Sequence, residues 1–285
     1  MYKIKFFSSF CDSANCKEVF ERLCEMKVFT DKGLCKDIQI TLGEDYTHVI
    51  ILNTAMPVIP ARIPKQNVIG LAFEPLIYLN LTKNFVDYAV KNIGKYFIGD
   101  KLNLPNPFIE HYSYMWHVTP LKHIPIKMNK MSIMISMKYH TFGHKYRHEL
   151  TSRILSEKLP IDIYGRGCKA YTVDSPHLKG EFDNIEPYES YDFHIAIENV
   201  ESNHYFSEKI TNPLLNGTTP IYWGCKNIES YFPNEVIRLI GNVEEDIRLI
   251  KDILENPEKY KRHIDLEKIK TEIYLLQNLE NIFTP

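Results

Sequence analysis

Short apolar runs alternate with amphipathic stretches along most of this chain, and that alternation constrains its fold more than any other feature. The segment THVIILN (47–53) is almost continuously apolar, as expected for a strand that is buried on both faces of a sheet. Between such runs, segments 14–27, 84–92 and 145–158 are typical of helices. The other expected strands are 3–7, 37–42, 67–75, 95–100, 131–137, 161–165, 191–197 and 219–223. This order predicts an α/β protein with parallel sheets.

The alternation lapses once, near the middle of the chain. The segment WHVTPLKHIPIKMNK (116–130) contains two prolines and no clear period, which indicates a linker. A chain of 285 residues is long enough for two domains of ordinary size. We therefore expect one α/β domain over residues 1–122 and a second over residues 123–285, facing each other across a cleft.

Charge and cysteine content exclude several classes of protein. The formal net charge is −2, so no broad basic field is expected to recruit nucleic acid or an anionic membrane. The six cysteines form no C-x-x-C pair and have no histidine at zinc-finger spacing, which indicates free thiols in a reducing compartment. The segment MYKIKFFSSFCDS is too polar for a signal sequence, and no apolar run approaches the roughly 18 residues of a membrane helix. We expect a soluble, cytoplasmic protein without an integral membrane segment, which can be an oligomer.

The string FHIAIENVESNHYFSEKITNPLLNGTTPIYWG (193–224) contains the strongest candidates for a binding site. Glu198 and Asn199 end an expected parallel strand, and ligands of open parallel sheets bind beyond such strand ends. Ser207 is a suitable N-cap for the helix that follows. The first amides of that helix would then form an anion site at the same edge of the sheet.

Two charged side chains stand at the start of that helix. Lys209 adds a full positive charge to the anion site, which suits a diphosphate. Glu208, beside it, can accept hydrogen bonds from hydroxyl groups. A ligand with both phosphates and hydroxyls is a nucleotide sugar, and the pair predicts a site for one.

Pro213 leaves two interpretations of this helix. Either the helix continues through Pro213 with a kink, or a short turn precedes a second helix with Asn212 as N-cap and Pro213 at its first position. Gly217 is expected to end the helix in both cases.

The same string closely resembles the signature of the glycosyltransferase family 10 fucosyltransferases. That signature has a strand ending in F-E-N, a loop, Y-x-[ST]-E-K, a helix and P-I-Y-W-G. The matching segments here are Ile197–Asn199, Tyr205–Lys209 and Pro220–Gly224. The resemblance covers residues 131–260 well and the N-terminal half faintly. It implies the GT-B fold, with two Rossmann-like domains, the first on the acceptor side and the second binding the nucleotide sugar.

The resemblance also implies roles for individual residues. Lys209 is expected to contact the diphosphate of GDP-fucose, and Glu208 the hydroxyls of fucose or ribose. Tyr205 is expected to line the donor pocket, and Asn199 to shape the loop beneath it. The expected donor-binding residues are Arg147, Glu198, Asn199, Tyr205, Ser207, Glu208 and Lys209.

Arg147 is included because the family carries a phosphate-binding arginine on the first helix of its C-terminal domain. The segment FGHKYRHELTSRIL (142–155) offers Arg147 and Arg153, and Arg147 is the better match because it lies early in the helix. A planar guanidinium can donate two parallel hydrogen bonds to phosphate oxygens. Arg166, in IDIYGRGC (161–168), is a weaker candidate for a place near the nucleotide.

The catalytic base is expected in the N-terminal half. An inverting transfer needs one carboxylate to deprotonate the acceptor hydroxyl while GDP leaves from the opposite face of the sugar. Glu74 ends an expected strand just before Pro75, and the family has its base at a comparable strand end. Glu110 and Glu44 are the alternatives.

No cofactor other than the donor substrate is expected, and a divalent metal is not expected to be essential. The chain has no D-x-D, which metal-dependent enzymes commonly use to hold a nucleotide diphosphate. His140, His144 and His148 are spaced as zinc-binding pairs on a helix are. No carboxylate or thiol partner has helical spacing on that face, so cleft-lining or surface histidines are the better interpretation.

These observations predict an inverting fucosyltransferase that transfers L-fucose from GDP-fucose to a glycan hydroxyl, in an α-1,3 linkage by resemblance. Two alternatives stay open. The same fold can use another nucleotide sugar, or the chain can be a sugar-nucleotide or glycan-binding protein without turnover. No nucleic-acid partner is expected.

Overall fold

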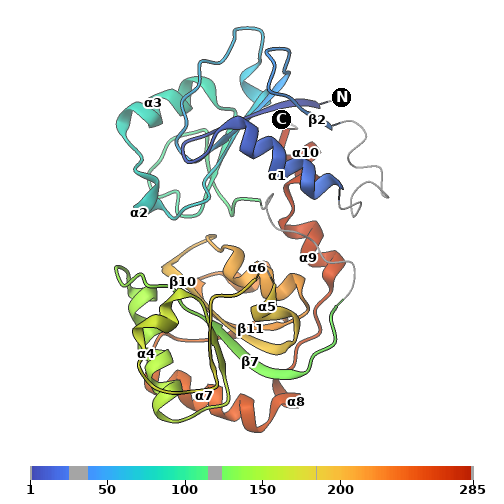
Figure 1. The fold of residues 1–285 in the computed structure, drawn as a ribbon. Helices are drawn as coiled ribbons and strands as arrows, with labels where there is room; N and C mark the ends of the chain where they lie inside the picture. Colours follow the sequence, from blue (N-terminus) through green and yellow to red (C-terminus); the bar gives the residue numbers. More distant parts are fainter. Residues whose placement is uncertain (1, 26–37, 115–123, 184, 284–285) are drawn as a thin grey trace. The chain divides into compact units, whose positions relative to one another are not determined.

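The computed structural model describes residues 2–25, 38–114, 124–183 and 185–283. They form two compact units, each built on one six-stranded sheet (Figure 1). The first unit comprises Met1–Pro120, Ser202–Tyr205 and Lys270–Pro285, and the second comprises Leu121–Glu201 and Phe206–Ile269. The expected boundary between residues 122 and 123 lies outside the described residues.

The first unit is a parallel sheet with the strand order β2-β1-β3-β4-β5-β6. The strands are β1 (Tyr2–Ser8), β2 (Ile38–Ile40), β3 (His48–Leu52), β4 (Val68–Leu71), β5 (Lys95–Ile98) and β6 (Phe108–Glu110). The helices are α1 (Ser13–Glu25), α2 (Leu76–Leu79), α3 (Lys83–Asn92) and α10 (Leu275–Phe283). Strand order reverses between β1 and β3, and ligands of such sheets bind at that switch point.

Aromatic side chains fill the core of the first unit. The ring of Tyr96 lies 5.0 Å from that of Phe108 and 5.5 Å from that of Phe85, centroid to centroid. The buried Tyr96 hydroxyl donates a hydrogen bond of 2.8 Å to the Asn53 carbonyl at the end of β3. The apolar runs of β3, β4 and β5 therefore pack as a sheet covered on both faces, as their composition predicts.

The second unit has the strand order β12-β11-β10-β7-β8-β9. Its strands are β7 (Asn129–Met134), β8 (Asp162–Tyr164), β9 (Leu178–Gly180), β10 (Tyr191–Ser202), β11 (Thr219–Cys225) and β12 (Ile237–Arg238). Its helices are α4 (Phe142–Ser156), α5 (Glu186–Glu189), α6 (Glu208–Leu215), α7 (Val243–Glu255) and α8 (Pro257–Tyr260), and α9 (Leu266–Ile273) leads back to the first unit. Counted within the unit, this is the Rossmann order 3-2-1-4-5-6, with its switch point between β7 and β10.

Helices α4 and α7 pack together on one face of the second sheet, and α5 and α6 pack together on the other (Figure 1). Trp223 of β11 packs beneath α4, with its ring 5.8 Å from that of Tyr146 and 5.1 Å from that of Phe142. Trp223 is thus a packing residue, and Tyr222 is completely buried beside it.

The N-terminal end of α4 lies three residues earlier than the sequence pattern predicts. Thr141 caps the helix by accepting a hydrogen bond of 3.2 Å from the His144 amide. In turn, His144 Nδ1 accepts a hydrogen bond from the Thr141 amide. This capping box supports three extra residues ahead of the expected start. It also directs the first turn of α4 toward the end of β10.

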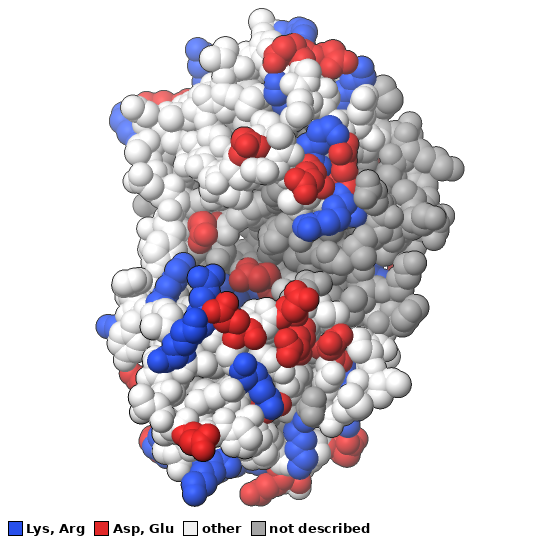
Figure 2. Space-filling model, viewed as in Figure 1, with Lys and Arg blue, Asp and Glu red and all other residues white. Residues whose placement is uncertain are grey.

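The surface shows no single field of charge. Figure 2 shows acidic and basic side chains interspersed over the visible face of each unit, in keeping with the net charge of −2. Among the described residues, no helix is long and apolar enough to cross a membrane.

Candidate functional site

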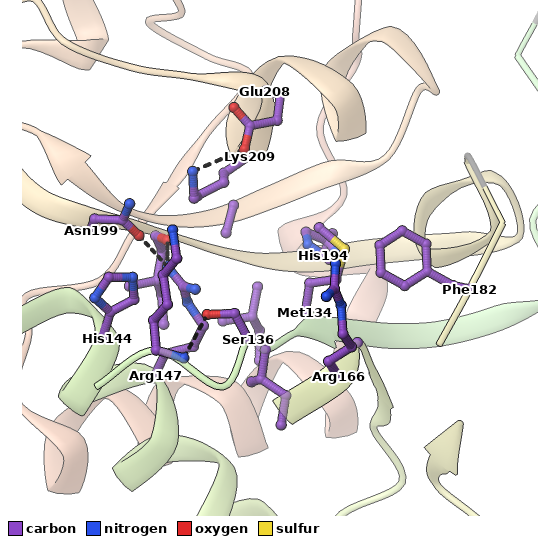
Figure 3. Close-up of a pocket in the computed structure, with 16 residues that line it drawn as sticks. Met134, Ser136, His144, Arg147, Arg166, Phe182, His194, Asn199, Glu208 and Lys209 are labelled. Atoms are coloured by element: carbon purple, nitrogen blue, oxygen red, sulfur yellow. Dashed lines mark hydrogen bonds and ion pairs between the residues drawn. The ribbon is translucent and has the colours of Figure 1, made fainter. Parts of the chain in front are cut away.

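A cavity of about 320 Å³ opens in the second unit between the end of β7 and the middle of β10, at the switch point of its sheet (Figure 3). Its walls come from the end of β7, the start of α4, the turn after β8, the middle of β10 and the first turn of α6. The lining residues are Met134, Ile135, Ser136, Lys138, His144, Arg147, Gly165, Arg166, Phe182, His194, Ile195, Ala196, Ile197, Asn199, Glu208 and Lys209. The location is the one where open parallel sheets bind their ligands.

Beneath the cavity, Glu198 links β10 to the start of α6. The sequence pattern places Glu198 and Asn199 at the end of this strand, but β10 continues to Ser202, so both residues lie within it. The Glu198 side chain is completely buried and accepts hydrogen bonds from the Ser207 amide (2.9 Å) and the Ser207 hydroxyl (2.8 and 2.9 Å). Lys209 Nζ lies 3.6 Å from Glu198 Oε2 and 3.1 Å from Ser207 Oγ. The carboxylate therefore fixes both the helix N-cap and the lysine that follows it.

Two glycines allow the surrounding backbone to approach Glu198. A Cβ atom on Gly143, in the first turn of α4, would lie 1.9 Å from the Glu198 carbonyl oxygen. A Cβ atom on Gly224, in β11, would lie 2.4 Å from Glu198 Cγ. A side chain at either position would collide with Glu198, so both positions require glycine. This explains why a glycine follows the segment P-I-Y-W.

Helix α6 is one continuous helix, from Ser207 as N-cap through Pro213 to the C-cap before Gly217. The helix therefore continues through Pro213, as the first of the two interpretations expects, and no second helix starts at Asn212. The Gly217 amide donates to the Leu214 carbonyl (3.0 Å) and the Thr218 amide to the Pro213 carbonyl (2.9 Å), and Gly217 has a left-handed φ of 64°. This is a Schellman motif, and it confirms that Gly217 ends the helix.

The two charged residues of α6 present opposite charges to the cavity. Lys209 Nζ donates a hydrogen bond of 3.0 Å to Glu208 Oε1 (Figure 3). Burial alone would lower the pKa of Lys209, but the carboxylates of Glu198 and Glu208 outweigh burial and raise it. The Glu208 side chain is 45% exposed, whereas that of Lys209 is 19% exposed. The lysine is thus a charged group held in a fixed position at the cavity wall.

Arg147 supplies the second cation from the first turns of α4. It is 6% exposed, and its Nη2 donates to the Ile197 carbonyl and to Asn199 Oδ1, the latter over 3.3 Å. In Figure 3 the Arg147–Asn199 contact lies on one side of the cavity and Arg166 and Phe182 lie on another. Burial lowers the pKa of Arg147, yet a guanidinium stays charged at neutral pH.

The structure brings four of the expected donor-binding residues together at the cavity: Arg147, Asn199, Glu208 and Lys209. Arg166, the weaker candidate, also lines it. Glu198 and Ser207 lie below the wall and support it through the contacts described above.

The remaining two expected residues belong to the first unit. Tyr205 is part of Ser202–Tyr205, which leaves the second unit and is held by Asp100, whose Oδ1 accepts a hydrogen bond of 2.9 Å from Asn203 Nδ2. Glu74 is an exposed residue beyond the carboxyl end of β4, immediately before Pro75, which caps α2. Its role as a base stays a prediction.

The sequence pattern did not single out several other lining residues. Ser136 and Lys138 follow β7, Phe182 follows β9, and His194 lies within β10. For Ser136 and Lys138 a signal exists, because they follow the strand next to which the order of the sheet reverses. Phe182 and His194 carry no such signal, because only the assembled sheet brings them to the cavity.

The histidines of the 140–148 segment have contacts within the protein. Burial lowers the pKa of His144 to about 4, and the neutral ring bonds to Thr141. His148 bonds to the Tyr171 hydroxyl (3.0 Å) and the Ser136 carbonyl (2.9 Å). The described part of the chain contains no group of three or more His, Cys, Asp or Glu residues that could hold a metal ion.

A buried guanidinium and a partly buried ammonium beside the exposed carboxylate of Glu208 can bind an anion that also carries hydroxyl groups. The guanidinium of Arg147 and the ammonium of Lys209 are both suited to phosphate oxygens.

Comparison with known proteins agrees with this geometry. The family model described as glycosyltransferase family 10 (fucosyltransferase), C-terminal part, matches residues 126–278. The chain belongs to glycosyltransferase family 10. The match includes the whole of the cavity described above, from β7 to α6, and it confirms the resemblance that the 193–224 string carries.

Two relatives of this family 10 chain illustrate the range of sequence identity and coverage. A putative fucosyltransferase of Acanthamoeba polyphaga mimivirus is 25% identical over 75% of this chain and 38% of its own length. Alpha-(1,3)-fucosyltransferase B of Drosophila melanogaster is 35% identical over 31% of this chain and 21% of its own length. This chain thus spans less than half the length of the curated relatives that it matches.

A solved structure extends the likeness to the whole chain. The crystal structure of an α1,3-fucosyltransferase with GDP-fucose has a TM-score of 0.53 and 15% sequence identity, covering 100% of this chain and 90% of that one. At that identity the likeness concerns the fold. It confirms the expected GT-B class, with two Rossmann-like units.

Proposed function

We propose that this chain transfers L-fucose from GDP-fucose to a hydroxyl group of a glycan. The observation that carries the proposal is the pair of cations, the buried Arg147 and the partly buried Lys209, at the Rossmann switch point of the unit that matches family 10. Such a pair suits the two phosphates of a nucleotide diphosphate, and the family supplies the expectation of fucose.

Arg147 and Lys209 would hold the diphosphate from two sides. Arg147 comes from α4 and Lys209 from α6, so their charges enter the cavity from different elements. Removing one charged donor of this kind from a leaving-group site costs about 2.7–4 kcal/mol of transition-state stabilisation in comparable sites. The pair would therefore help GDP to depart as well as bind.

Glu208 would accept hydrogen bonds from the hydroxyls of fucose or ribose. Its carboxylate is partly exposed and already bonded to Lys209, so the lysine holds it toward the cavity. Asn199, within β10 and bonded to Arg147, would hold the guanidinium in place beside the donor. The family resemblance also assigns Tyr205 to the donor pocket.

The chemistry would be a single displacement with inversion. Glu74 takes the proton of the acceptor hydroxyl, and the acceptor oxygen forms a bond to the anomeric carbon of fucose. The bond between that carbon and the β-phosphate oxygen breaks, and GDP leaves with the electron pair. A β-linked donor gives an α-linked product, and the family suggests the α-1,3 position. No divalent metal takes part, and Arg147 and Lys209 supply the positive charge.

Incubation of the wild-type chain with GDP-fucose and a panel of oligosaccharides tests the proposal. We expect GDP release that depends on an acceptor, persists in excess EDTA and yields an α-fucosylated product by NMR. Products of the β configuration would contradict inversion, and loss of activity in EDTA would contradict the metal-free mechanism. Transfer from a UDP-sugar with none from GDP-fucose would contradict the donor assignment.

A further inference from the structure

Two cysteines face each other in the first unit, where β1 turns into α1. Asp12 caps α1, since its Oδ1 accepts a hydrogen bond of 2.8 Å from the Asn15 amide. Cys11 precedes this cap, and Cys16 lies in the first helical turn. These are the two positions that form a hydrophobic staple across a helix N-terminus. Here the staple consists of two thiols, with Cys11 Sγ 3.3 Å from Cys16 Sγ.

We propose that Cys11 and Cys16 form a reversible intramolecular disulfide when the protein meets an oxidant such as hydrogen peroxide. Both sulfurs are free thiols in the structure and already lie in contact. A disulfide bond is about 2.05 Å long, so its formation needs an approach of little more than about 1 Å. The staple geometry has already paired the two side chains, and the helix start need not unfold.

Accessibility assigns different roles to the two thiols. Cys16 is completely buried, whereas Cys11 is partly exposed in the turn. Burial shields Cys16 from a dissolved oxidant, and it also raises the pKa of Cys16 to about 12. Cys11 is therefore the thiol that meets the oxidant, and Cys16 is the resolving partner.

The reaction then balances in two steps. The Cys11 sulfur attacks hydrogen peroxide, the oxygen–oxygen bond breaks, and Cys11 becomes a sulfenic acid with release of one water. The Cys16 sulfur attacks the Cys11 sulfur, and the sulfur–oxygen bond breaks. The hydroxyl leaves with the Cys16 proton as a second water. Two thiols are oxidised to one disulfide, and one peroxide is reduced to two waters.

Other interpretations of the pair are weaker. A structural zinc site needs four ligands, and no group of three candidate metal ligands occurs among the described residues. The other described free thiols, Cys168 and Cys225, are buried in the second unit. The pair also lies at the carboxyl end of β1, beside the β1/β3 switch point, so the disulfide would form at the ligand-binding edge of the first sheet.

Peptide mapping tests the proposal directly. Trypsin cleaves after Lys5 and Lys17, and the resulting peptide Phe6–Lys17 contains both cysteines and no others. The folded, full-length chain is treated with hydrogen peroxide, free thiols are then alkylated, and the digest is analysed by mass spectrometry. We expect this peptide two hydrogens lighter than its reduced form and without alkyl groups. Treatment of the oxidised chain with dithiothreitol before the alkylation step should restore two alkylated thiols in this peptide.

Matched variants complete the design. Cys11→Ser and Cys16→Ser should each remove the light peptide, while Cys168→Ser should leave it unchanged. Two alkylated thiols after peroxide would overturn the proposal. So would a sulfinic acid on Cys11 beside an alkylated Cys16, a cross-link from either residue to Cys24 or Cys35, or a disulfide that forms only when the chain is unfolded in urea.

Discussion

Lys209 Nζ lies 3.6 Å from the completely buried carboxylate of Glu198, and the two residues come from different elements, α6 and β10. The same carboxylate accepts hydrogen bonds from the N-cap Ser207. Burial raises the pKa of Glu198, and the ammonium group of Lys209 opposes that effect. Glu198 thus connects the local structure of the strand–helix junction with the charge that faces the cavity.

Lys209→Met should weaken GDP binding by about 10- to 100-fold, because a hydrogen bond to a charged group is typically worth about 1.5–3 kcal/mol. The matched control is Lys145→Met, which removes an exposed lysine from α4 outside the cavity. Isothermal titration calorimetry measures both. Equal affinities for Lys209→Met and the wild type would show that this lysine does not hold the diphosphate.

Gly143→Ala should destabilise the second unit by about 1–3 kcal/mol, because the new Cβ would collide with the Glu198 carbonyl. Helix propensity predicts the opposite sign, a gain of about 1 kcal/mol for alanine inside α4. Urea unfolding of the Gly143→Ala protein shows whether the free energy of unfolding falls or rises. Gly43→Ala, in an exposed loop where the new Cβ would meet only the ends of side chains, is the control and should change little. A stabilised Gly143→Ala protein would refute the close approach.

Glu74→Gln should reduce the rate of transfer by about 10²- to 10⁴-fold while leaving GDP affinity unchanged, as expected for loss of a general base. Glu44→Gln and Glu110→Gln are the matched tests of the two alternatives. Glu44 pairs with Lys5 at 2.8 Å, and Glu110 accepts a hydrogen bond of 3.2 Å from the Lys101 amide. If Glu110→Gln or Glu44→Gln loses turnover and Glu74→Gln keeps it, the base is assigned to the wrong residue.

Stability should fall as the medium becomes acidic. Burial lowers the pKa of His194 to about 3, whereas the unfolded chain has a histidine pKa near 6.5. Between these values the unfolded state binds a proton that the folded state does not. The contribution of His194 is therefore complete above about pH 6.5 and declines below it, by up to about 1.4 kcal/mol per pH unit.

Urea unfolding at several pH values checks this slope. His194→Gln should flatten the decline between about pH 6.5 and pH 4, although the variant is less stable at neutral pH. His263→Gln, which replaces an exposed histidine, should keep the wild-type slope. An unchanged slope in His194→Gln would contradict the assignment.

The local part of the site could be predicted from the sequence because its determinants are local. Ser207 as N-cap, Lys209 in the first turn of α6 and Gly217 at its end follow from the preferences of helix termini. The parallel α/β class follows equally from the apolar runs. Each of these features depends on residues within a few positions of one another.

The rest depends on contacts between distant segments. The burial of Glu198 requires Gly143 and Gly224 to come close from two other elements. The placement of Tyr205 in the first unit depends on Asp100, which holds Asn203. Helix α4 begins earlier than the sequence pattern predicts because His144 completes a capping box with Thr141. A propensity pattern contains none of these contacts.

The most direct test of the central claim is a calorimetric titration of the wild-type chain with GDP, GDP-fucose, GDP-mannose, UDP and UDP-GlcNAc. We predict that GDP and GDP-fucose bind at the Arg147–Lys209 cavity and that the two UDP ligands do not. Preferential binding of UDP ligands would contradict the donor assignment while leaving the GT-B fold intact. Absence of binding by any of the five ligands would contradict a nucleotide-sugar site altogether.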